Sequence, residues 1–346
     1  MKLSLDATYS TGKNLTGVGI YSREIIWGLA EAHQEAEFRL YYRTHRFLAS
    51  RHEVYPSNAR ARLLSDLPFL PQFDFFHGLN QRLPRRKAKR TVTTFHDLFV
   101  ISGDYSTPEF RKRFTEQARE AAEKSDLIIC VSHFTAGQVQ ELLQVDKSKL
   151  RVVHHGVRFP AANQEPLQFN RDKKVILFVG AIQKRKNIGR LVKAFEQVGT
   201  DWKLVLAGSL GFGSAEILEQ IANSPRRADI ELPGYVTDLE LENWYANCDI
   251  FAFPSLDEGF GIPVLEAMGW GIPVFTSDRS AIPEVTGDAA VHVNPEDQDE
   301  MIFGLKTLTE QAGLRRKLSQ MGMERAAEFS WEAAVDQTWA VYKELL

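Results

Sequence analysis

The sequence has little cysteine and no long apolar run, and each shortage excludes a class of protein. Only two of its 346 residues are cysteine. Both Cys130 and Cys248 lie in apolar, strand-like stretches ("DLIICVS" and "NCDIFAF"). Two distant thiols of this kind predict core residues in a reducing compartment, not a disulfide framework or a metal site. No stretch approaches the length that a membrane span needs.

The sequence also lacks tandem repeats and low-complexity tracts, and we expect no signal peptide. Its first residues, "MKLSLDATYS", resemble a strand and have neither the apolar core nor the cleavage site of a signal peptide. We therefore expect a cytoplasmic protein.

Charge is distributed unevenly along the chain, although the net charge is only -3. Residues 1–165 hold 24 Lys and Arg against 18 Asp and Glu, a balance of +6, and the remainder holds 18 against 27, a balance of -9. Much of the surplus lies in "RLPRRKAKR", residues 82–90. Such a run can be a solvated face, a contact with an anionic membrane surface, or a site for a phosphorylated substrate. Nucleic acid is not expected, because no nucleic-acid motif accompanies the run.

Strand-like and helix-like stretches alternate throughout the chain, whose length favours two domains. Seven strand candidates precede residue 157 and six follow residue 173, as in "KVILFVG" and "DIFAFPS". Strands that are apolar on both faces and separated by helices predict parallel sheets covered on both sides. The sequence therefore predicts an α/β protein with two doubly wound, Rossmann-like domains.

A polar, proline-bearing stretch without periodicity, residues 158–174, predicts the linker between these domains. We place the domains at residues 1–165 and 166–329. Ligands of doubly wound sheets bind at the carboxyl ends of the strands. We therefore expect the chemistry in a central cleft that the two domains face.

The stretch "SLDEGFGIPVLEAMGWGIPVFTS", residues 255–277, places two carboxylates at one strand-to-helix corner. Gly259 and Gly261 allow close approach of backbone N–H groups to a phosphate, and Pro263 suits the first helical turn. The carboxylates of Glu258 and Glu266 accept hydrogen bonds, which suits the hydroxyls of a sugar or ribose. The alternative is that both glutamates are surface residues.

A second element, "KVILFVGAIQKRKNIGRLVKAF", has Arg185 and Lys186 just before a helix that starts near Asn187, a good N-cap residue. Two cations beside a helix N-terminus favour an anion site, although a solvated basic loop is the alternative. The loop "GYVTD", with Tyr235 and Val236, follows another strand and could contact a base through its backbone. Together these elements predict a nucleotide-sugar pocket.

At this point the sequence resembles a known family. "EGFGIPVLEAMGWGIPV" is similar to the E-x7-E signature of family-4 retaining glycosyltransferases with the GT-B fold. Further similar segments, in family order, are "TGVGIYSREI", "TFHDL", "ICVSHFT", "HHGV" and "GAIQKRKNIGRLVKAF". The end of the chain, residues 330–346, resembles the helix that packs back onto the first domain.

The resemblance implies a role for each matching residue. Glu258 would contact the transferred sugar, Glu266 would bind the ribose, and Lys186 with Arg185 would neutralise the diphosphate. His96 would approach the reacting carbon of the donor. The remaining implied positions are Gly259, Phe260, Gly261 and Ile262 at the donor corner, and Gly17, Gly19 and Asp97 on the acceptor side.

One position departs from the family pattern, because Ala181 follows Gly180 where many members have arginine. Arg185 must then supply the positive charge that the missing arginine would provide. Asp297 and Asp299 form a nominal D-x-D, but their position between a strand and a helix favours helix capping. His154 and His155 are interpreted as hinge packing. We therefore expect neither a metal ion nor a cofactor.

The expected reaction moves a sugar from a nucleotide diphosphate sugar to a hydroxyl acceptor, with retention. Mannose from GDP-mannose is favoured, with UDP-linked sugars close behind. The acceptor would be a glycan or a lipid-linked sugar in cell-envelope assembly; the apolar residues 67–76 could serve a lipid or the core. Two alternatives are a sugar-nucleotide epimerase and a catalytically silent, nucleotide-sugar-binding subunit.

Overall fold

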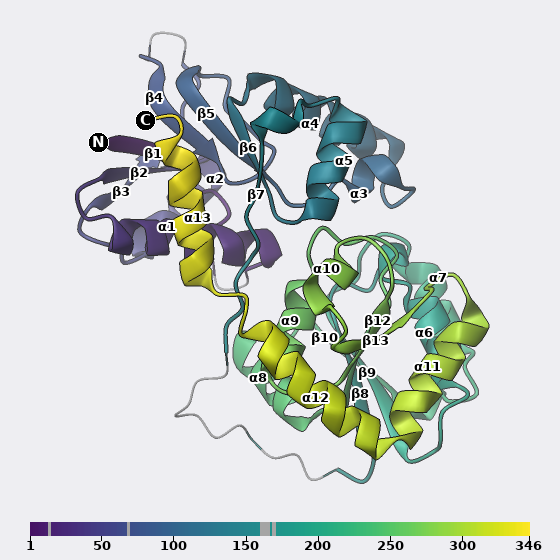
Figure 1. Ribbon diagram of the computed structural model, residues 1–346. Helices are drawn as coiled ribbons and strands as arrows, with labels where there is room; N and C mark the ends of the chain where they lie inside the picture. Colours follow the sequence, from purple (N-terminus) through teal and green to yellow (C-terminus); the bar gives the residue numbers. More distant parts are fainter. Residues whose placement is uncertain (13–14, 68–69, 160–166, 168–170) are drawn as a thin grey trace. The chain divides into compact units, whose positions relative to one another are not determined.

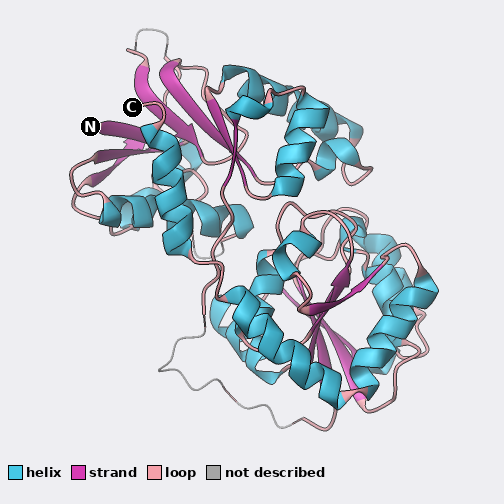
Figure 2. Ribbon diagram, viewed as in Figure 1, coloured by secondary structure: helices cyan, strands magenta, loops and turns pink. Residues whose placement is uncertain are grey.

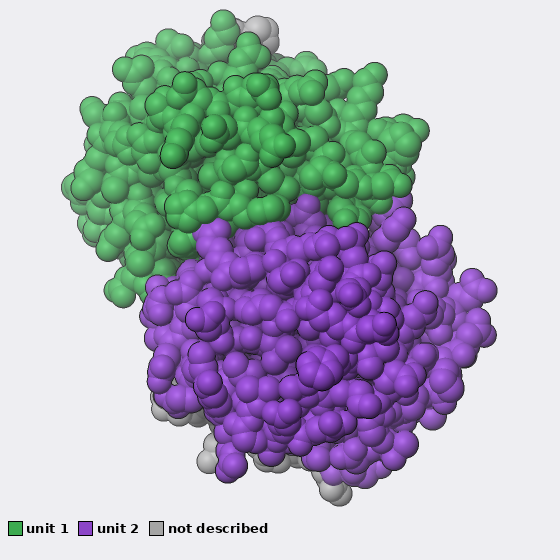
Figure 3. Space-filling view, turned by 45° about the vertical axis from the view of Figure 1, so that its right-hand side comes forward, with its two compact units in different colours: residues 1–156, 330–346 green, residues 157–329 purple. Residues whose placement is uncertain are grey.

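The computed structural model describes all residues except 13–14, 68–69, 160–166 and 168–170, and forms two compact units (Figures 1 and 3). The first unit comprises Met1–Gly156 with Ser330–Leu346, and the second comprises Val157–Phe329. Most of the expected linker, and the boundary expected after residue 165, fall outside the described residues.

The first unit is built on a seven-stranded parallel sheet with the strand order β3-β2-β1-β4-β5-β6-β7 (Figure 2). Its strands are β1 (Lys2–Asp6), β2 (Glu37–Tyr42), β3 (Ala59–Leu63), β4 (Phe73–Gly78), β5 (Ala88–Phe95), β6 (Leu127–Cys130) and β7 (Leu150–Val152). Its helices are α1 (Gly17–Ala32), α2 (Thr44–Phe47), α3 (Phe99–Ser102), α4 (Pro108–Lys124), α5 (His133–Leu143) and α13 (Trp331–Lys343).

The C-terminal helix α13 is part of the first unit's core. A Cβ atom on Gly28 of α1 would lie 2.4 Å from Cγ2 of Val335, so only glycine allows the two helices to approach this closely. Val335, Val341 and Tyr342 of α13 are buried in the same apolar cluster as β1 and β2. The last residues of the chain therefore complete a core that the first residues begin.

The basic run found in the sequence begins in the connection from β4 to β5 and ends in the first residues of β5, Ala88 to Arg90. The strands are parallel, with Phe73 opposite Ala88 and Gly78 opposite Thr93, so residues 79–87 return from the carboxyl edge of the sheet to its amino edge. Arg86 fixes this connection: its backbone N–H donates to Asp66 (3.0 Å) and its guanidinium lies 3.8 Å over the Phe73 ring.

The second unit is built on a six-stranded parallel sheet with the order β10-β9-β8-β11-β12-β13. Its strands are β8 (Lys174–Val179), β9 (Trp202–Ala207), β10 (Ile230–Gly234), β11 (Ile250–Phe253), β12 (Val274–Ser277) and β13 (Ala290–Val293). Its helices are α6 (Ile188–Phe195), α7 (Ser214–Ala222), α8 (Asp238–Asn247), α9 (Ile262–Gly269), α10 (Ile282–Thr286), α11 (Gln298–Glu310) and α12 (Ala312–Ala326).

The α/β prediction is confirmed, with a strand at each of the thirteen candidate stretches. Each strand order reverses direction once, between β1 and β4 in the first sheet and between β8 and β11 in the second. In doubly wound sheets, ligands bind at the carboxyl ends of the strands at these reversals. The loops after β8 and β11 are therefore the expected ligand-binding loops of the second sheet.

Several smaller expectations can also be compared with the structure. Cys130 is fully buried as expected, but Cys248 is half-buried and ends helix α8 instead of lying in a strand. Phe73, Phe75 and Phe76 are core residues, whereas Leu67 is exposed. Within the described residues, no helix is both long and apolar enough to cross a membrane.

Candidate functional site

The loop after β8 is held in place by tight backbone packing. Gly208, which follows the neighbouring strand β9, has a φ of 151° and its Cβ, if present, would lie 1.9 Å from the Gly180 carbonyl oxygen. Only glycine fits there. The loop then forms a short 3-10 turn, Lys184–Lys186, which places two cations at the carboxyl edge of the sheet.

Arg185 and Lys186 are buried, with exposed fractions of only 7% and 8%. This excludes the solvated basic loop that the sequence left open. Helix α6 begins where expected, but the prediction that Asn187 caps it is wrong: its side chain makes no capping bond and donates to the Pro295 carbonyl instead (2.7 Å). Asn187 has a left-handed backbone (φ 58°), unlike the extended backbone of a typical N-cap residue.

Glu258, in the loop after β11, joins these two cations. Its Oε1 accepts from Lys186 Nζ at 2.5 Å and lies 2.9 Å from a guanidinium nitrogen of Arg185. Arg185 also donates to the Asp257 carbonyl. Glu258 is 8% exposed, so it is not a surface acid. Burial alone would raise the pKa of Glu258, but Arg185 and Lys186 outweigh burial and lower this pKa to about 2.

The glycine corner after Glu258 is structurally demanding. Gly261 has a φ of 111° and immediately precedes α9, whose second residue is Pro263. A Cβ at Gly261 would lie 2.8 Å from Cδ1 of Ile282. Phe260 is buried edge-on against Phe329, with ring centroids 5.9 Å apart. The corner thus leads the backbone directly from the buried ion cluster into the helix N-terminus.

Glu266 lies in α9 and is held by a residue that the sequence reasoning missed. The hydroxyl of Tyr245 in α8 donates to Glu266 Oε2 at 2.9 Å. Burial raises the pKa of Glu266 to about 7, and the bond from Tyr245 opposes that rise. Helical spacing from Leu241 could have placed Tyr245 on a buried face. No sequence pattern names its hydrogen-bond partner.

The loop expected to contact a base, which contains Tyr235 and Val236, is partly exposed to solvent. Tyr235 is 47% exposed, and Val236 is half-buried. Thr237, the next residue, forms a capping box with Glu240 at the start of α8: Glu240 accepts from the Thr237 N–H (2.7 Å), and Thr237 accepts from the Glu240 N–H (3.3 Å). The loop is therefore anchored to the helix that also carries Tyr245.

The implied first-unit residues gather around α1 and the end of β5. His96 follows β5 directly, is buried, and its Nε2 bonds the Leu79 carbonyl at 2.9 Å. The rings of Tyr21 and His155 lie 4.7 and 5.5 Å from the His96 ring. Burial lowers the pKa of His96 to about 4, so it is neutral at physiological pH. His155 is packed as the sequence predicted.

The other first-unit positions differ in character. Gly17 is exposed, whereas a Cβ on Gly19 would lie 2.9 Å from the Tyr9 carbonyl oxygen, so backbone packing already explains that glycine. Asp97 is half-buried and is not an N-cap residue, because Leu98 holds that position before α3. That these first-unit residues form one site with Arg185, Lys186 and Glu258 stays a prediction.

Two further features do not belong to this cluster. Asp297 caps α11 by accepting from the N–H groups of Asp299 and Glu300, both at 3.0 Å, which confirms the capping interpretation of the nominal D-x-D.

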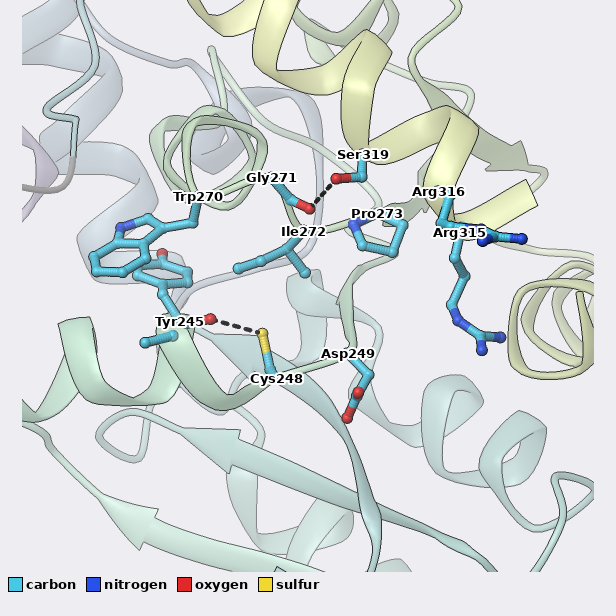
Figure 4. Close-up of a pocket in the computed structure, with 11 residues that line it drawn as sticks. Tyr245, Cys248, Asp249, Trp270, Gly271, Ile272, Pro273, Arg315, Arg316 and Ser319 are labelled. Carbon is cyan, nitrogen blue, oxygen red and sulfur yellow. Dashed lines mark hydrogen bonds between the residues drawn. The ribbon is translucent and has the colours of Figure 1, made fainter. Parts of the chain in front are cut away.

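A cavity of about 500 Å³ lies at the opposite, amino edge of the second sheet, where Asp249 and Pro273 precede β11 and β12 (Figure 4). It contains none of the predicted ligand contacts.

Comparison with protein families places the chain among known proteins. A family model described as "Glycosyltransferase Family 4" matches residues 16–159, and one described as "Glycosyl transferases group 1" matches residues 161–325. The chain belongs to these glycosyltransferases. The family resemblance seen in the sequence is therefore confirmed, and the match extends over both units.

Individual relatives and solved structures agree with this assignment. O-antigen chain mannosyltransferase B of Escherichia coli is 28% identical, with 95% of this chain and 96% of the relative covered. Sucrose-phosphate synthase from Thermosynechococcus elongatus has a TM-score of 0.77 at 19% identity, covering 100% of this chain and 99% of that structure. HepE from Anabaena, solved in complex with UDP and glucose, has a TM-score of 0.74 at 16% identity, with 99% of both chains covered. The fold is thus GT-B, with two Rossmann-like domains.

Proposed function

We propose that this glycosyltransferase is a retaining enzyme that moves a sugar from a nucleotide diphosphate sugar to a hydroxyl acceptor. The observation that carries the proposal is the buried cluster of Arg185, Lys186 and Glu258 at the strand-order reversal of the second sheet. Two buried cations beside the Glu258 carboxylate, at the carboxyl ends of the strands, favour an anionic ligand such as a diphosphate.

The cluster and the helix corner would act on the leaving group. As the sugar becomes oxocarbenium-like, the departing diphosphate gains negative charge, and fixed cations stabilise that charge without reorganising. In the proposed step the bond from the anomeric carbon to the diphosphate oxygen breaks while the bond to the acceptor oxygen forms on the same face. The acceptor proton passes to the departing phosphate oxygen. Glu258 would position the sugar, and His96 would lie near the reacting carbon.

Protein cations would serve where many transferases use a metal ion. Ala181 removes one cation that the family pattern supplies, and Arg185 is already buried against the same carboxylate as Lys186. We propose that Arg185 supplies the missing charge and that no metal ion is required. Full turnover in excess chelator is the expected result, and loss of turnover would overturn this part of the proposal.

For the donor, we propose mannose, carried by GDP. A mannosyltransferase relative that covers nearly the whole chain supports mannose. The complex of HepE with UDP and glucose supports a UDP-linked sugar as the second candidate. The exposed Tyr235 and the adjacent Val236 would contact the base, and Glu266 the ribose.

For the acceptor, we propose a glycan or lipid-linked sugar in cell-envelope assembly, reached by a cytoplasmic protein that touches an anionic membrane. The relative's role as an O-antigen chain enzyme favours this class. A cavity of about 250 Å³ in the first unit is lined by the basic residues Arg85, Arg86, Lys87 and Lys124 and by apolar residues that include Phe76 and Leu83. That combination suits an anionic headgroup.

Thermal unfolding in the presence of GDP, UDP, ADP and their sugars tests the donor assignment. A ligand that binds only the folded state at a hundred times its Kd adds about 2.7 kcal/mol of stability. We expect GDP and GDP-mannose to raise the melting temperature of the wild type but not of Lys186→Ala. Lys193→Ala, which removes an exposed lysine of α6, is the matched control and should respond like the wild type.

Turnover assays distinguish the proposed transferase from the two alternatives, an epimerase and a silent binding subunit. Transfer to an added acceptor, with a small residual hydrolysis, is the expected outcome. Conversion of the donor without any acceptor would replace the proposal by an epimerase, and binding with neither transfer nor hydrolysis would replace it by a silent binding subunit. Absence of any shift with all three nucleotides would remove the donor site altogether.

A further inference from the structure

Tyr245 is the one side chain with a hydrogen bond to Glu266 among the described residues. Its hydroxyl donates to Oε2 at 2.9 Å, and Tyr245 is only 3% exposed. The bond links two helices that are neighbours around the sheet, because α8 precedes β11 and α9 follows it. The described contacts leave the other oxygen, Oε1, without a hydrogen bond from the protein.

The Tyr245 ring has little freedom to move. It stacks with Trp270, which lines the same cavity, at a centroid distance of 6.3 Å and an interplanar angle of 25° (Figure 4). It also packs on Phe251 of β11 at 6.0 Å. A buried aromatic ring held on two sides fixes the direction of its hydroxyl. The donor atom is thus presented to Glu266 by a rigid support.

The hydroxyl also acts on the charge of its partner. Burial disfavours the ionised carboxylate of Glu266, and a donated hydrogen bond favours it. A carboxylate with one oxygen held and the other open accepts hydroxyl donors in a defined direction. Two neighbouring hydroxyls on a ribose match that arrangement.

The helix that carries Tyr245 also begins at the loop proposed to contact the base. Its first turn is locked by the Thr237–Glu240 capping box, directly after Tyr235 and Val236. A single rigid helix therefore sets both the base loop at its start and the Glu266 contact in its last turn. The distance between the base and ribose contacts would follow from this one element.

We propose that Tyr245 is a positioning residue for the donor's ribose, holding one oxygen of Glu266 so that the other accepts the ribose hydroxyls. This inference rests on the proposed function and adds a residue to it. Loss of the Tyr245 hydroxyl would let the Glu266 side chain rotate and would leave its Oε2 without this donor. Hydrogen bonds to charged groups are strong enough for about a tenfold loss of affinity or more.

Calorimetric binding of GDP and its deoxyribose counterpart to the full-length protein tests this inference. The wild type should prefer the ribonucleotide. Tyr245→Phe, which removes only the hydroxyl, should bind the ribonucleotide about tenfold more weakly and show a smaller preference for it. For the nucleotide sugar, KM should rise about tenfold while kcat stays within about twofold, because the ribose contact is the same in the ground state and the transition state.

Tyr55→Phe is the matched control, because it removes a partly buried hydroxyl that donates to the Ser50 carbonyl in the first unit. It should leave nucleotide binding unchanged. Retention of the full ribose preference in Tyr245→Phe would overturn the inference while leaving the proposed function intact. A wild type that prefers neither sugar would overturn both the Glu266 assignment and this inference, and a wild type that binds no nucleotide would overturn the proposed function with them.

Discussion

At the scale of single residues, the ion cluster makes an unusual prediction about nucleotide affinity. The Glu258 carboxylate would compete with a diphosphate for the same two cations, because Lys186 and Arg185 both lie within 3 Å of its Oε1. Glu258→Gln should therefore bind free nucleoside diphosphate several-fold more tightly than the wild type, although sugar transfer should fall by orders of magnitude. Lys186→Ala should weaken both. Calorimetric titration with GDP measures the affinities.

The stability of the same variants provides the control. Removing the carboxylate breaks the buried ion pairs of Glu258 with Arg185 and Lys186, which typically costs about 3–5 kcal/mol, and a bound diphosphate would offset part of that loss. Glu258→Gln should therefore melt earlier than the wild type without nucleotide and gain more from added GDP. If Glu258→Gln bound GDP more weakly than the wild type, the competition argument would be wrong.

Glu266 predicts a pH dependence of donor binding. Its folded-state pKa is raised to about 7, so the carboxyl gains its proton as pH falls through that value. Ribose hydroxyls that donate to it bind the ionised form better, so binding should release a proton and affinity should rise with pH up to about 7, then level off. One proton allows at most a tenfold change per pH unit.

The Glu266 prediction can be checked by measuring the affinity for a nucleotide sugar by calorimetry at pH values from about 5.5 to about 8, on both sides of the Glu266 pKa. The phosphates of a nucleotide sugar stay ionised over that range, so they add no pH dependence of their own. Glu266→Gln should bind more weakly and independently of pH. Arg158 and Asp238 also influence this carboxyl and are unchanged in the comparison. Equal slopes in the two proteins would show that another group titrates.

The residues of the donor corner could be predicted because their types and spacing carry the chemistry. A carboxylate followed by two glycines before a helix, and adjacent cations after a strand, predict Glu258, Arg185 and Lys186 as donor contacts from sequence alone. The direct pairing of Glu258 with those cations was not predicted, because it joins residues 72 positions apart. Tyr245 was missed for the same reason, and Asn187 was misread because its backbone conformation overrides its usual preference for capping.

At the scale of elements, the thirteen strands were predictable because most of them are short apolar runs bounded by polar or glycine residues, although the edge strands β3 and β10 are more polar. The hydrogen bonds that attach α13 to the first sheet could not be predicted. Tyr342 of that helix bonds Nδ1 of the buried His77 in β4 at 2.6 Å, across 265 positions of sequence. Nε2 of the same ring bonds Thr94 of β5 at 2.9 Å. One histidine thus connects the last helix to the centre of the first sheet.

This connection predicts the cost of removing one hydroxyl from the last helix. Tyr342→Phe leaves Nδ1 of His77 buried without a partner, which typically costs about 1–3 kcal/mol of the free energy of unfolding. Urea unfolding monitored by circular dichroism measures the change. Gln337→Ala, on the exposed face of the same helix, should change stability by less than about 0.5 kcal/mol. A loss of equal size in both variants would assign the effect to the helix and not to the His77 bond.

At the scale of the whole molecule, the chain is basic in its first half and acidic in its second, as its sequence shows. In the structure, the residues of the basic run differ in whether their side chains have partners. Arg86 is occupied by Asp66, Pro71 and Phe73, whereas the side chains of Arg85 and Lys87 are exposed and make no hydrogen bond or ion pair within the described residues. Arg85 and Lys87 are therefore the residues of the run through which we propose a membrane contact.

We therefore expect the double variant Arg85→Ser, Lys87→Ser to lose affinity for anionic vesicles without losing stability. Each cation near an anionic surface contributes about 1 kcal/mol, so the two together correspond to roughly a thirtyfold weaker partition. Co-sedimentation with vesicles of anionic and of purely zwitterionic phospholipid measures it. Lys112→Ser, Arg113→Ser removes the same charge from an exposed stretch of α4 and should retain most of the binding. Equal losses in the two double variants would reduce the effect to net charge, and undiminished binding in both would exclude residues 85–87 as a membrane contact.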